Sequence, residues 1–267
     1  MCATCGCGDD GAVVTLAGED HHHHDDHHHH HHHQHPPVTE TISLEQKVLA
    51  KNDELAEQNR KWLAERSIAA FNLTSSPGAG KTTLLERTIR EIRATRPVSV
   101  IEGDQETLLD AERIRATGCR VVQINTGAGC HLDAEMTRRA LETLQPEPDS
   151  LLFIENVGNL VCPALFDLGE QTKVVVISVT EGADKPLKYP HMFAAAGLVI
   201  VNKTDLLPYV DFDLDQCASY AHSINPDVAI LAVSAKTGDG MAAWYDWIGA
   251  RKLNGAKLVV DKPHRPE

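Results

Sequence analysis

Short apolar runs recur along most of the chain and predict its architecture. From residue 68 onward seven such runs occur, many of them β-branched, and helical segments separate most of them. They cover residues 68–73, 98–101, 121–124, 151–154, 174–179, 198–201 and 228–233. Runs of this length are typical of strands buried on both faces. The alternation predicts an α/β fold, a mostly parallel sheet flanked by helices, with ligand loops at the carboxyl ends of the strands.

A longer helical pattern precedes the first predicted strand. Ser43-Leu44-Glu45-Gln46 reads as a capping box, in which the Ser43 hydroxyl and the Gln46 amide satisfy free backbone N–H groups. We therefore expect a helix to begin at Ser43 and to end near residue 66. Its apolar stripe at helical spacing consists of Leu44, Val48, Leu55 and Trp62. The helix lies either on the globular domain or against a partner helix.

The segment before this helix has a different composition. Residues 1–20 are rich in glycine and cysteine, and residues 21–35 contain twelve of the sixteen histidines. Neither stretch can supply a core. We therefore expect a disordered, metal-binding tail over residues 1–42, a helix over 43–66, a globular domain over 67–252 and a C-terminal tail over 253–267.

Size and charge narrow the classes of function. A chain of 267 residues with 42% hydrophobic content can bury one sizeable core. Its 25 basic and 38 acidic residues give a net charge of -13, which would repel nucleic acid. We find no secretion signal and no apolar stretch of bilayer length, so we expect a cytoplasmic protein without a membrane partner. Seven cysteines in such a chain favour thiols and metal ligands over disulfides.

The strongest motif stands between the first predicted strand and a helix expected to begin near Thr82. It reads Ser75-Ser76-Pro77-Gly78-Ala79-Gly80-Lys81-Thr82-Thr83. Backbone N–H groups of such a loop cradle phosphates, while Lys81 reaches the β- and γ-phosphates and the Thr82 hydroxyl binds Mg²⁺. Ser75 stands where the common pattern has its first glycine, and a plain glycine-rich turn is the alternative. The order of strand, loop and helix favours a nucleotide-binding loop.

A second motif indicates which base is bound. Asn202-Lys203-Thr204-Asp205 follows the strand predicted over 198–201. The Asp205 carboxylate can accept hydrogen bonds from N1–H and the exocyclic amino group of guanine, whereas adenine presents no such pair of donors. In Ser234-Ala235-Lys236, placed on the following strand, the Ala235 N–H can donate to guanine O6. Such short strings are often solvated loops, but beside a phosphate loop they favour GTP over ATP.

Hydrolysis requires further groups at the same edge. Glu155-Asn156-Val157-Gly158 follows a predicted strand, so the Gly158 N–H can sense the γ-phosphate and Glu155 can act near Mg²⁺ or its water shell. Asp104 follows another strand and is a second candidate for positioning metal or water. Either carboxylate could instead be an ordinary loop residue. We find no unambiguous arginine finger or water-orienting glutamine, so we expect slow turnover unless another subunit assists.

Two segments of the tail suggest metal binding. Cys2, Cys5 and Cys7 form a compact motif whose thiolates, with one nitrogen donor, suit square-planar Ni²⁺ as well as tetrahedral Zn²⁺. A redox dithiol is the alternative. The histidine tract could be an affinity tag, but its position behind the cysteine motif and its Asp25-Asp26 interruption favour a native metal store.

A third candidate site lies in the globular domain. Cys130-His131 precedes a helix, and Cys162 follows Gly158 by four residues, so both should lie at the nucleotide edge of the sheet. We predict that these three residues bind metal and respond to the nucleotide, and a two-fold dimer could complete the site. Buried structural cysteines are the alternative. We expect Cys119 and Cys217 to be core residues.

Together these motifs resemble the HypB family, GTPases for nickel insertion into [NiFe]-hydrogenase. The resemblance rests on the Cys2-Cys5-Cys7 motif, the histidine tract, the phosphate loop and the Asn202 motif, and on Gly129-Cys130-His131-Leu132-Asp133 and Glu155-Asn156-Val157-Gly158-Asn159-Leu160-Val161-Cys162-Pro163. It covers nearly the whole chain. It implies a GTP-linked homodimer, a high-affinity nickel site in the tail, and a zinc or nickel site in the GTPase domain. It further implies a HypA-type metallochaperone as partner and the hydrogenase large-subunit precursor as target.

Two other interpretations remain open at this stage. A urease-type nickel GTPase would share the phosphate loop and the coupling to metal, although the cysteine motifs favour the hydrogenase interpretation. A nickel-storage protein with little GTPase activity is the alternative that is not an enzyme, and the intact Lys81, Thr82 and Asp205 argue against it.

Overall fold

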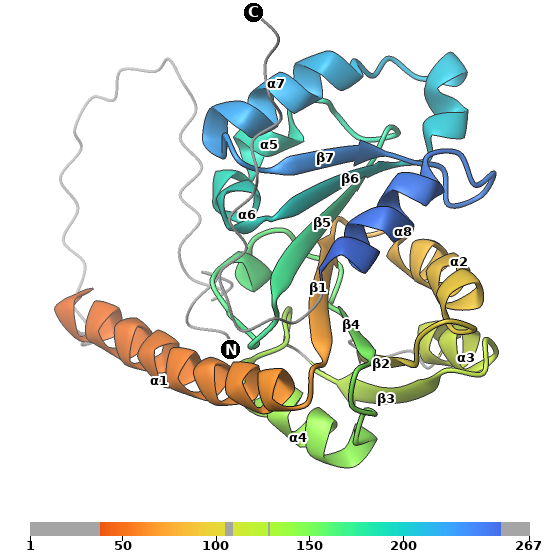
Figure 1. Ribbon diagram of the computed structural model, residues 1–267. Helices are drawn as coiled ribbons and strands as arrows, with labels where there is room; N and C mark the ends of the chain where they lie inside the picture. Colours follow the sequence, from red (N-terminus) through yellow and green to blue (C-terminus); the bar gives the residue numbers. More distant parts are fainter. Residues whose placement is uncertain (1–37, 105–108, 128, 252–267) are drawn as a thin grey trace, which may run out of the picture.

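The sheet predicted from the apolar runs is present, and helices cover both of its faces (Figure 1). The computed structural model describes residues 38–104, 109–127 and 129–251. In this part of the chain the strands are β1 (Ala69–Ser75), β2 (Val98–Asp104), β3 (Arg120–Asn125), β4 (Leu151–Glu155), β5 (Thr172–Ser178), β6 (Leu198–Asn202) and β7 (Ala229–Ala232). They lie in the order β3-β2-β4-β1-β5-β6-β7, and every neighbouring pair is parallel. Each predicted run therefore coincides with a strand.

The helices form a layer on each face of the sheet. They are α1 (Val38–Glu65), α2 (Lys81–Ile92), α3 (Leu109–Arg115), α4 (Ala134–Leu144), α5 (Lys185–Lys188), α6 (Pro190–Ala195), α7 (Leu214–Ile224) and α8 (Met241–Ala250), with 3₁₀ turns η1 (Cys162–Ala164) and η2 (Thr204–Tyr209). Helices α2, α3 and α8 share one hydrophobic cluster with the sheet, whereas α1 with α4 and α6 with α7 form clusters on the other face. Among the described helices, none is both long and apolar enough to cross a bilayer.

Burial follows the position of each strand in the sheet. In the central strand β1, Phe71 and Leu73 pack toward α2 and α8, and Ala70 packs toward α1 and α4, because successive side chains point to opposite faces. The expected burial on both faces is wrong for β3 and β7, which are only partly buried. These are the edge strands, and each has a neighbouring strand on one side of the sheet only.

Helix α1 corrects two predictions. It begins at Val38, five residues before the predicted cap at Ser43, so this capping box does not start the helix. It directly follows the Pro36-Pro37 pair of the sequence, and proline is disfavoured in a helix interior. The helix lies on the domain against α4, as one of the two alternatives predicted.

The buried face of α1 agrees only in part with the predicted apolar stripe, since Trp62 packs against the core but the most buried positions lie elsewhere. Val48 is 46% exposed, whereas Ala56 and Leu63 are buried together with Asn52 and Asn59. The Asn59 amide donates to the carbonyl oxygens of Ala134 and Leu168 at 2.8 and 3.0 Å. Asn52 likewise bonds to backbone groups of the domain. Hydrogen bonding lets these asparagines face the core, which an apolar pattern cannot reveal.

The parallel arrangement sets the position of the functional loops. Because all strands run in one direction, the loops that follow β1, β2, β4 and β6 emerge at the same edge of the sheet. Strand β1 lies between β4 and β5, so its loop is flanked by those of the neighbouring strands. In doubly wound α/β proteins this edge is where ligands bind.

Candidate functional site

The loop between β1 and α2 adopts the conformation that a phosphate-binding loop requires. Gly78 and Gly80 have φ angles of 73° and 94°. At Gly80 a Cβ atom would lie 2.6 Å from the Asn202 Nδ2 atom, so no larger residue fits there. A cavity of about 460 Å³ opens beside the loop and the start of α2. Its lining includes Gly78, Ala79, Gly80, Lys81, Thr82, Thr83, Asp110, Arg113, Glu155, Gly158 and Lys203.

Lys81 is held in the place from which it can reach a phosphate. Its Nζ atom donates to the Ser75 hydroxyl at 2.8 Å, and that hydroxyl donates to the Ser76 carbonyl oxygen at 2.6 Å. Burial lowers the pKa of Lys81, and the nearby Glu155 opposes this shift. The serine that departs from the common motif thus positions the lysine, and it does so without a positive φ angle that would require glycine.

Thr82 and Glu155 both line the cavity and bond to each other. The Thr82 hydroxyl donates to Glu155 Oε1 at 2.7 Å, and Glu155 Oε2 is buried without a hydrogen-bond partner among the described residues. Burial raises the pKa of Glu155, while Lys81 and the Thr82 hydroxyl lower it. A hydroxyl beside an unsatisfied carboxylate oxygen matches the oxygen ligands that Mg²⁺ prefers. The residues present therefore fit this cation.

A further carboxylate, not predicted from the sequence, lies beside this pair. Glu102 of β2 is paired in register with Glu155 of β4. Burial raises the pKa of Glu102 to about 8, with further contributions from Glu155 and Asp104. Asp104 lies at the end of β2, as predicted, and its carbonyl oxygen accepts the Thr126 N–H at 2.9 Å. Glu102 was not predicted, because one position inside a strand gives no signal of which residue it pairs with on the neighbouring strand.

The motif predicted to read the base lies beside the phosphate loop. Asn202 donates to the Ala79 carbonyl oxygen at 2.9 Å and accepts the Ala235 N–H at 3.1 Å. Lys203 Nζ donates a hydrogen bond to the Gly78 carbonyl oxygen at 2.7 Å. Asp205 Oδ1 accepts the Ser234 hydroxyl at 2.7 Å, which orients the carboxylate. These contacts hold the phosphate loop and the base-reading loops in one arrangement.

Two details differ from the sequence expectations for this region. Ser234, Ala235 and Lys236 follow β7 in a turn instead of lying on the strand. The Ala235 N–H, expected to donate to guanine O6, is bonded to Asn202 in this structure. It would have to be shared between Asn202 and the base, so this role stays a prediction.

Helix α3 brings two further charged residues to the cavity. Asp110 and Arg113 line it and form an ion pair at 3.2 Å. Arg113 also donates to the Thr83 hydroxyl at 3.1 Å and to Glu86 at 2.5 Å. Neither residue was predicted, because no motif marks this short helix. An arginine of the same chain therefore lies at the rim of the phosphate cavity.

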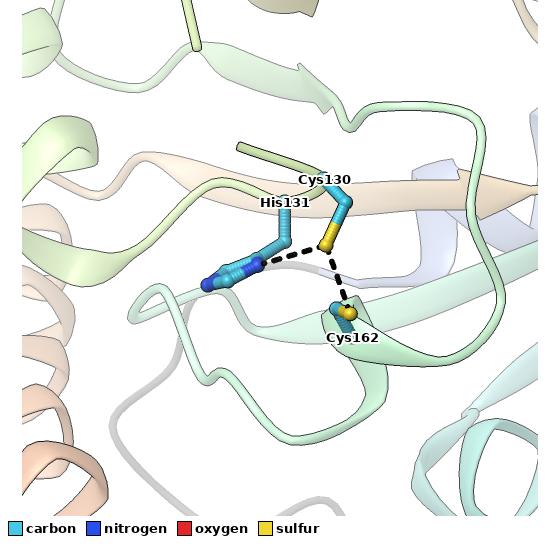
Figure 2. Close-up of side chains that lie close together, drawn as sticks. All are labelled: Cys130, His131 and Cys162. Atoms are coloured by element: carbon cyan, nitrogen blue, oxygen red, sulfur yellow. Dashed lines mark hydrogen bonds between the residues drawn. The ribbon is translucent and has the colours of Figure 1, made fainter. Parts of the chain in front are cut away.

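The three predicted metal ligands of the globular domain lie together (Figure 2). The sulfur atoms of Cys130 and Cys162 are 2.9 Å apart, and Cys130 Sγ is 3.7 Å from His131 Nδ1. All three ligand atoms lie within 4.8 Å of one another. The His131 ring stacks on Phe166, with a centroid distance of 3.9 Å. We call Cys130, His131 and Cys162 the metal cluster.

The chemistry of the metal cluster suits a borderline metal ion. Burial lowers the pKa of His131, and Asp133 opposes the shift, so the ring favours the neutral form that binds metal. Two thiols and one imidazole suit Zn²⁺ or Ni²⁺, and one coordination position is left for a further ligand. The predicted tail site of Cys2, Cys5 and Cys7 and the histidine tract lie outside the described residues. Cys119 and Cys217 are buried, as expected of core residues.

The metal cluster and the phosphate cavity share the chain segment after β4. Gly158 lines the cavity and lies against the phosphate loop, because a Cβ atom built on it would be 3.2 Å from Pro77 Cα. Cys162 is four residues further on, at the start of η1. The structure therefore places a candidate γ-phosphate sensor and a candidate metal ligand in one short segment.

Comparison with known proteins agrees with this geometry. Residues 69–232 match the family model described as CobW/HypB/UreG, nucleotide-binding domain. The hydrogenase maturation factor HypB of Azotobacter chroococcum is 57% identical over 217 residues, which cover 81% of this chain and 70% of that protein. The crystal structure of HypB from Archaeoglobus fulgidus has a TM-score of 0.71 and 42% identity over 77% of this chain and 100% of that one. HypB from Helicobacter pylori in complex with nickel has a TM-score of 0.72 and 36% identity over 75% of this chain and 94% of that one.

Proposed function

The chain belongs to the HypB family of hydrogenase maturation factors, and on this premise we propose that it hydrolyses GTP to GDP and phosphate in order to deliver nickel during [NiFe]-hydrogenase assembly. One observation carries the proposal. The segment after β4 lines the phosphate cavity at Gly158 and supplies Cys162 to the metal cluster. Because one segment serves both ligands, the state of the nucleotide can change the hold on the metal.

In this proposal each residue of the nucleotide site has its own role in binding or hydrolysis, and these residues already lie near one another. Asp205 would select guanine, and the N–H groups of the phosphate loop would bind the phosphates. Lys81 would turn from Ser75 to the β- and γ-phosphates, where its charge offsets the charge that develops during hydrolysis. Mg²⁺, when bound at Thr82 and Glu155, would neutralise further phosphate charge. Asp104 is the candidate for orienting the attacking water.

Nickel is the cargo and not a resident cofactor in this proposal. The tail site of Cys2, Cys5 and Cys7 would bind it most tightly, and the histidine tract would hold ions in reserve. The metal cluster would bind nickel or zinc in a geometry that depends on the nucleotide. A tenfold difference in affinity between two states requires only about 1.4 kcal/mol, less than a few charge-assisted hydrogen bonds to a phosphate provide. Linkage then requires that metal change the relative affinity for GTP and GDP by the same factor.

The remaining partners follow from the family. We propose a GTP-linked homodimer in the cytoplasm, because two copies could complete the coordination of the metal cluster. A HypA-type metallochaperone would supply or receive the ion, and the hydrogenase large-subunit precursor would be the destination. Size-exclusion chromatography with GDP and with a non-hydrolysable GTP analogue tests the dimer, which should form with the analogue.

The proposed function is tested by deleting the gene for this protein from its host and measuring hydrogenase and urease activities in the cells. Loss of hydrogenase activity alone supports the proposal, whereas loss of urease alone supports the urease-type alternative. Complementation with the Lys81→Met variant then tests the need for the GTPase. If that variant restores full hydrogenase activity, the protein acts as a nickel store and not through GTP hydrolysis.

A second experiment separates the tail from the GTPase domain. Replacing Cys2, Cys5 and Cys7 by alanine should abolish the tightest nickel binding and leave GTP hydrolysis nearly intact, because the motif precedes the folded domain by tens of residues. Equilibrium metal titration against a chelator measures the affinity. Equal nickel affinity in the wild type and the triple variant would assign the tight site to the histidine tract or to the metal cluster.

A further inference from the structure

One side chain joins the two loops that carry the metal cluster. Asn159 follows Gly158 directly, and its Nδ2 atom donates to the Cys130 carbonyl oxygen at 3.2 Å. Its Oδ1 atom accepts the Val161 N–H at 2.8 Å, so the side chain is oriented by its own segment. Any displacement of Gly158 would therefore reach the backbone of Cys130 through this side chain, as well as Cys162 along the chain.

The segment that contains Asn159 is fixed at its beginning. Asn156 is buried, and its Oδ1 atom accepts the N–H groups of Leu132 and Val157 at 3.2 and 3.0 Å. Its Nδ2 atom donates to Asn72 Oδ1 at 3.2 Å. Asn72 lies in the middle of β1, between β4 and β5. Asn156 is thus tied to the centre of the sheet and to the loop of Cys130 and His131.

The same segment is fixed at its end by a buried lysine. Lys173 of β5 is 7% exposed, and its Nζ atom donates to the carbonyl oxygens of Pro163 and Phe166 at 2.7 and 3.2 Å. Glu170, also buried, lies 3.9 Å from Nζ and accepts the Asn72 amide at 3.0 Å. A buried ion pair is weak evidence of added stability, whereas the two hydrogen bonds of Lys173 fix the backbone groups that they join. Lys173 holds the residue after Cys162 and the ring partner of His131.

Residues 157–162 therefore lie between two fixed points, which are Asn156 and the contact of Lys173 with Pro163; we call Asn156 and Lys173 the anchors. Between them, Gly158 lies against the phosphate loop, and Asn159 bonds to the loop that carries Cys130. We propose that Asn159 is the positioning residue that transmits the nucleotide state to the metal cluster, and that Asn156 and Lys173 confine the movement to this segment. The inference rests on the proposed function, because it requires Gly158 to respond to the γ-phosphate. It assigns the coupling to one hydrogen bond that substitution can remove.

The test uses the full chain with Cys2, Cys5 and Cys7 replaced by serine. In this background a thiolate-to-nickel charge-transfer band reports the metal cluster, because histidine-bound nickel lacks thiolate ligands. Nickel is titrated at free concentrations set by a chelator, with GDP or with a non-hydrolysable GTP analogue. We expect affinities that differ between the two nucleotides by about fivefold or more.

The decisive variant is Asn159→Asp in the same background. The aspartate keeps an oxygen for the Val161 N–H but loses the donor toward the Cys130 carbonyl oxygen. We expect the two affinities to converge to within about twofold, while GTP hydrolysis continues. Asn225→Ala is the matched control, since this asparagine also donates to backbone carbonyl oxygens, those of Phe193, Ala194 and Ala196, far along the chain from the metal cluster. The control should keep the nucleotide dependence.

Substitution of the anchor Lys173 should lower nickel affinity with both nucleotides, unlike substitution of Asn159. Lys173→Met removes the donors to Pro163 and Phe166 and should lower nickel affinity by about tenfold with both nucleotides. Lys173→Arg keeps donors at this position and should recover most of the affinity. If Lys173→Met does not fold, the Arg variant and Asn159→Asp still carry the test. Nickel affinity unchanged in a folded Lys173→Met protein would overturn the role of the anchor.

The outcomes separate this inference from the proposed function. If the background protein shows nucleotide dependence and Asn159→Asp retains it, Asn159 does not transmit the signal, although the coupling itself stands. If Asn159→Asp lowers both affinities equally, the residue has only a structural role and the inference is overturned. If the background protein shows no nucleotide dependence, both the inference and the proposed coupling are overturned.

Discussion

The nucleotide site and the metal cluster lie on neighbouring loops but are held in different ways. The phosphate loop is tied by side chains to the base-reading loop, through Asn202 at Ala79 and Lys203 at Gly78. The metal cluster instead combines ligands from two loops, one of which also lines the phosphate cavity. Its geometry therefore depends on the position of residues 157–162. Under the proposed function, this difference suits one site that holds a nucleotide firmly and another that releases its ion.

The two regions also differ in charge. Lys81 lies among Glu155, Glu102, Asp104 and Asp110, which all favour its charged form, whereas burial disfavours it. The metal cluster holds two thiols and an imidazole that favours the neutral form. Substitutions in the nucleotide site should therefore act mainly through charge, and substitutions in the metal cluster mainly through coordination.

The largest effect should come from Lys81→Met. Loss of the charge that faces the phosphates should lower GTP hydrolysis by about a hundredfold or more, since one donor to a developing anion contributes that much. Phosphate release at saturating GTP measures this. Nickel binding by the metal cluster with GDP should be unchanged, and the exposed control Lys51→Met should hydrolyse GTP normally. Normal hydrolysis by Lys81→Met would remove Lys81 from the catalytic site.

Cys162→Ala should instead affect the metal cluster. Loss of one thiolate should lower the nickel affinity of the metal cluster by roughly ten- to a hundredfold, and GTP hydrolysis should change much less. The charge-transfer titration with the tail cysteines replaced measures this, with the buried Cys217→Ala as control. A larger loss of hydrolysis than of nickel affinity would show that the two regions are not separable in this way.

Asp205→Asn tests the specificity of the nucleotide site. The amide would place a donor against the donors of guanine, so GTP should bind roughly tenfold more weakly, while xanthosine triphosphate gains a partner for its C2 oxygen. Competition binding of the two nucleotides measures the shift. Ser234→Ala, which removes the hydroxyl that orients Asp205, should give a smaller change of affinity without reversing the preference. An unchanged preference for GTP in Asp205→Asn would exclude this loop as the base reader.

The last effect is on stability and not on activity or binding, namely the dependence of stability on pH through Glu102. Its pKa is about 8 in the folded chain, against 4.5 as its ordinary value, so between these limits the folded state holds more protons than the unfolded state. Stability should therefore fall as pH rises from about 5 to 8, by at most about 1.4 kcal/mol per pH unit.

Glu102→Gln removes this dependence, so the stability of the wild type relative to the variant should decrease over the same pH range. Urea unfolding without nucleotide or metal at several pH values measures it. Glu142→Gln, at an exposed carboxylate on α4, should follow the wild-type profile. A wild type that gains stability over this range relative to Glu102→Gln would contradict the raised pKa of Glu102.

Much of the fold and of the nucleotide site could be predicted because the signals are local. A strand buried in a parallel sheet is a short apolar run, and all seven runs became strands. The phosphate loop depends on glycine at fixed positions, and Gly78 and Gly80 do adopt positive φ angles. The site residues that were missed lack such signals. Asp110 and Arg113 line the cavity through the placement of α3, and Glu102 lies beside Glu155 through the pairing of β2 with β4.

The predictions for α1 failed for a related reason. A stripe of apolar residues was expected to face either the domain or a partner helix. Trp62 of this stripe does pack on the domain, but Asn52 and Asn59 also lie at the buried face, because backbone groups of the domain satisfy their amides. A sequence pattern shows which residues are polar, but it does not show whether the folded chain supplies their hydrogen-bond partners. The pairing of these asparagines is decided only when the helix packs.

The sequence by itself determined the strands and the phosphate loop, and it identified the candidate base-reading loop and the three candidate ligands of the metal cluster, because each depends on residue types at short spacings. The tertiary structure decided that Cys162 lies 2.9 Å from Cys130 and that Asn159 joins the two loops. It also decided that Lys173 and Asn156 anchor the ends of the segment between them. These contacts connect residues far apart in the chain, and they depend on the order β2-β4-β1-β5 of the sheet, which no local spacing encodes.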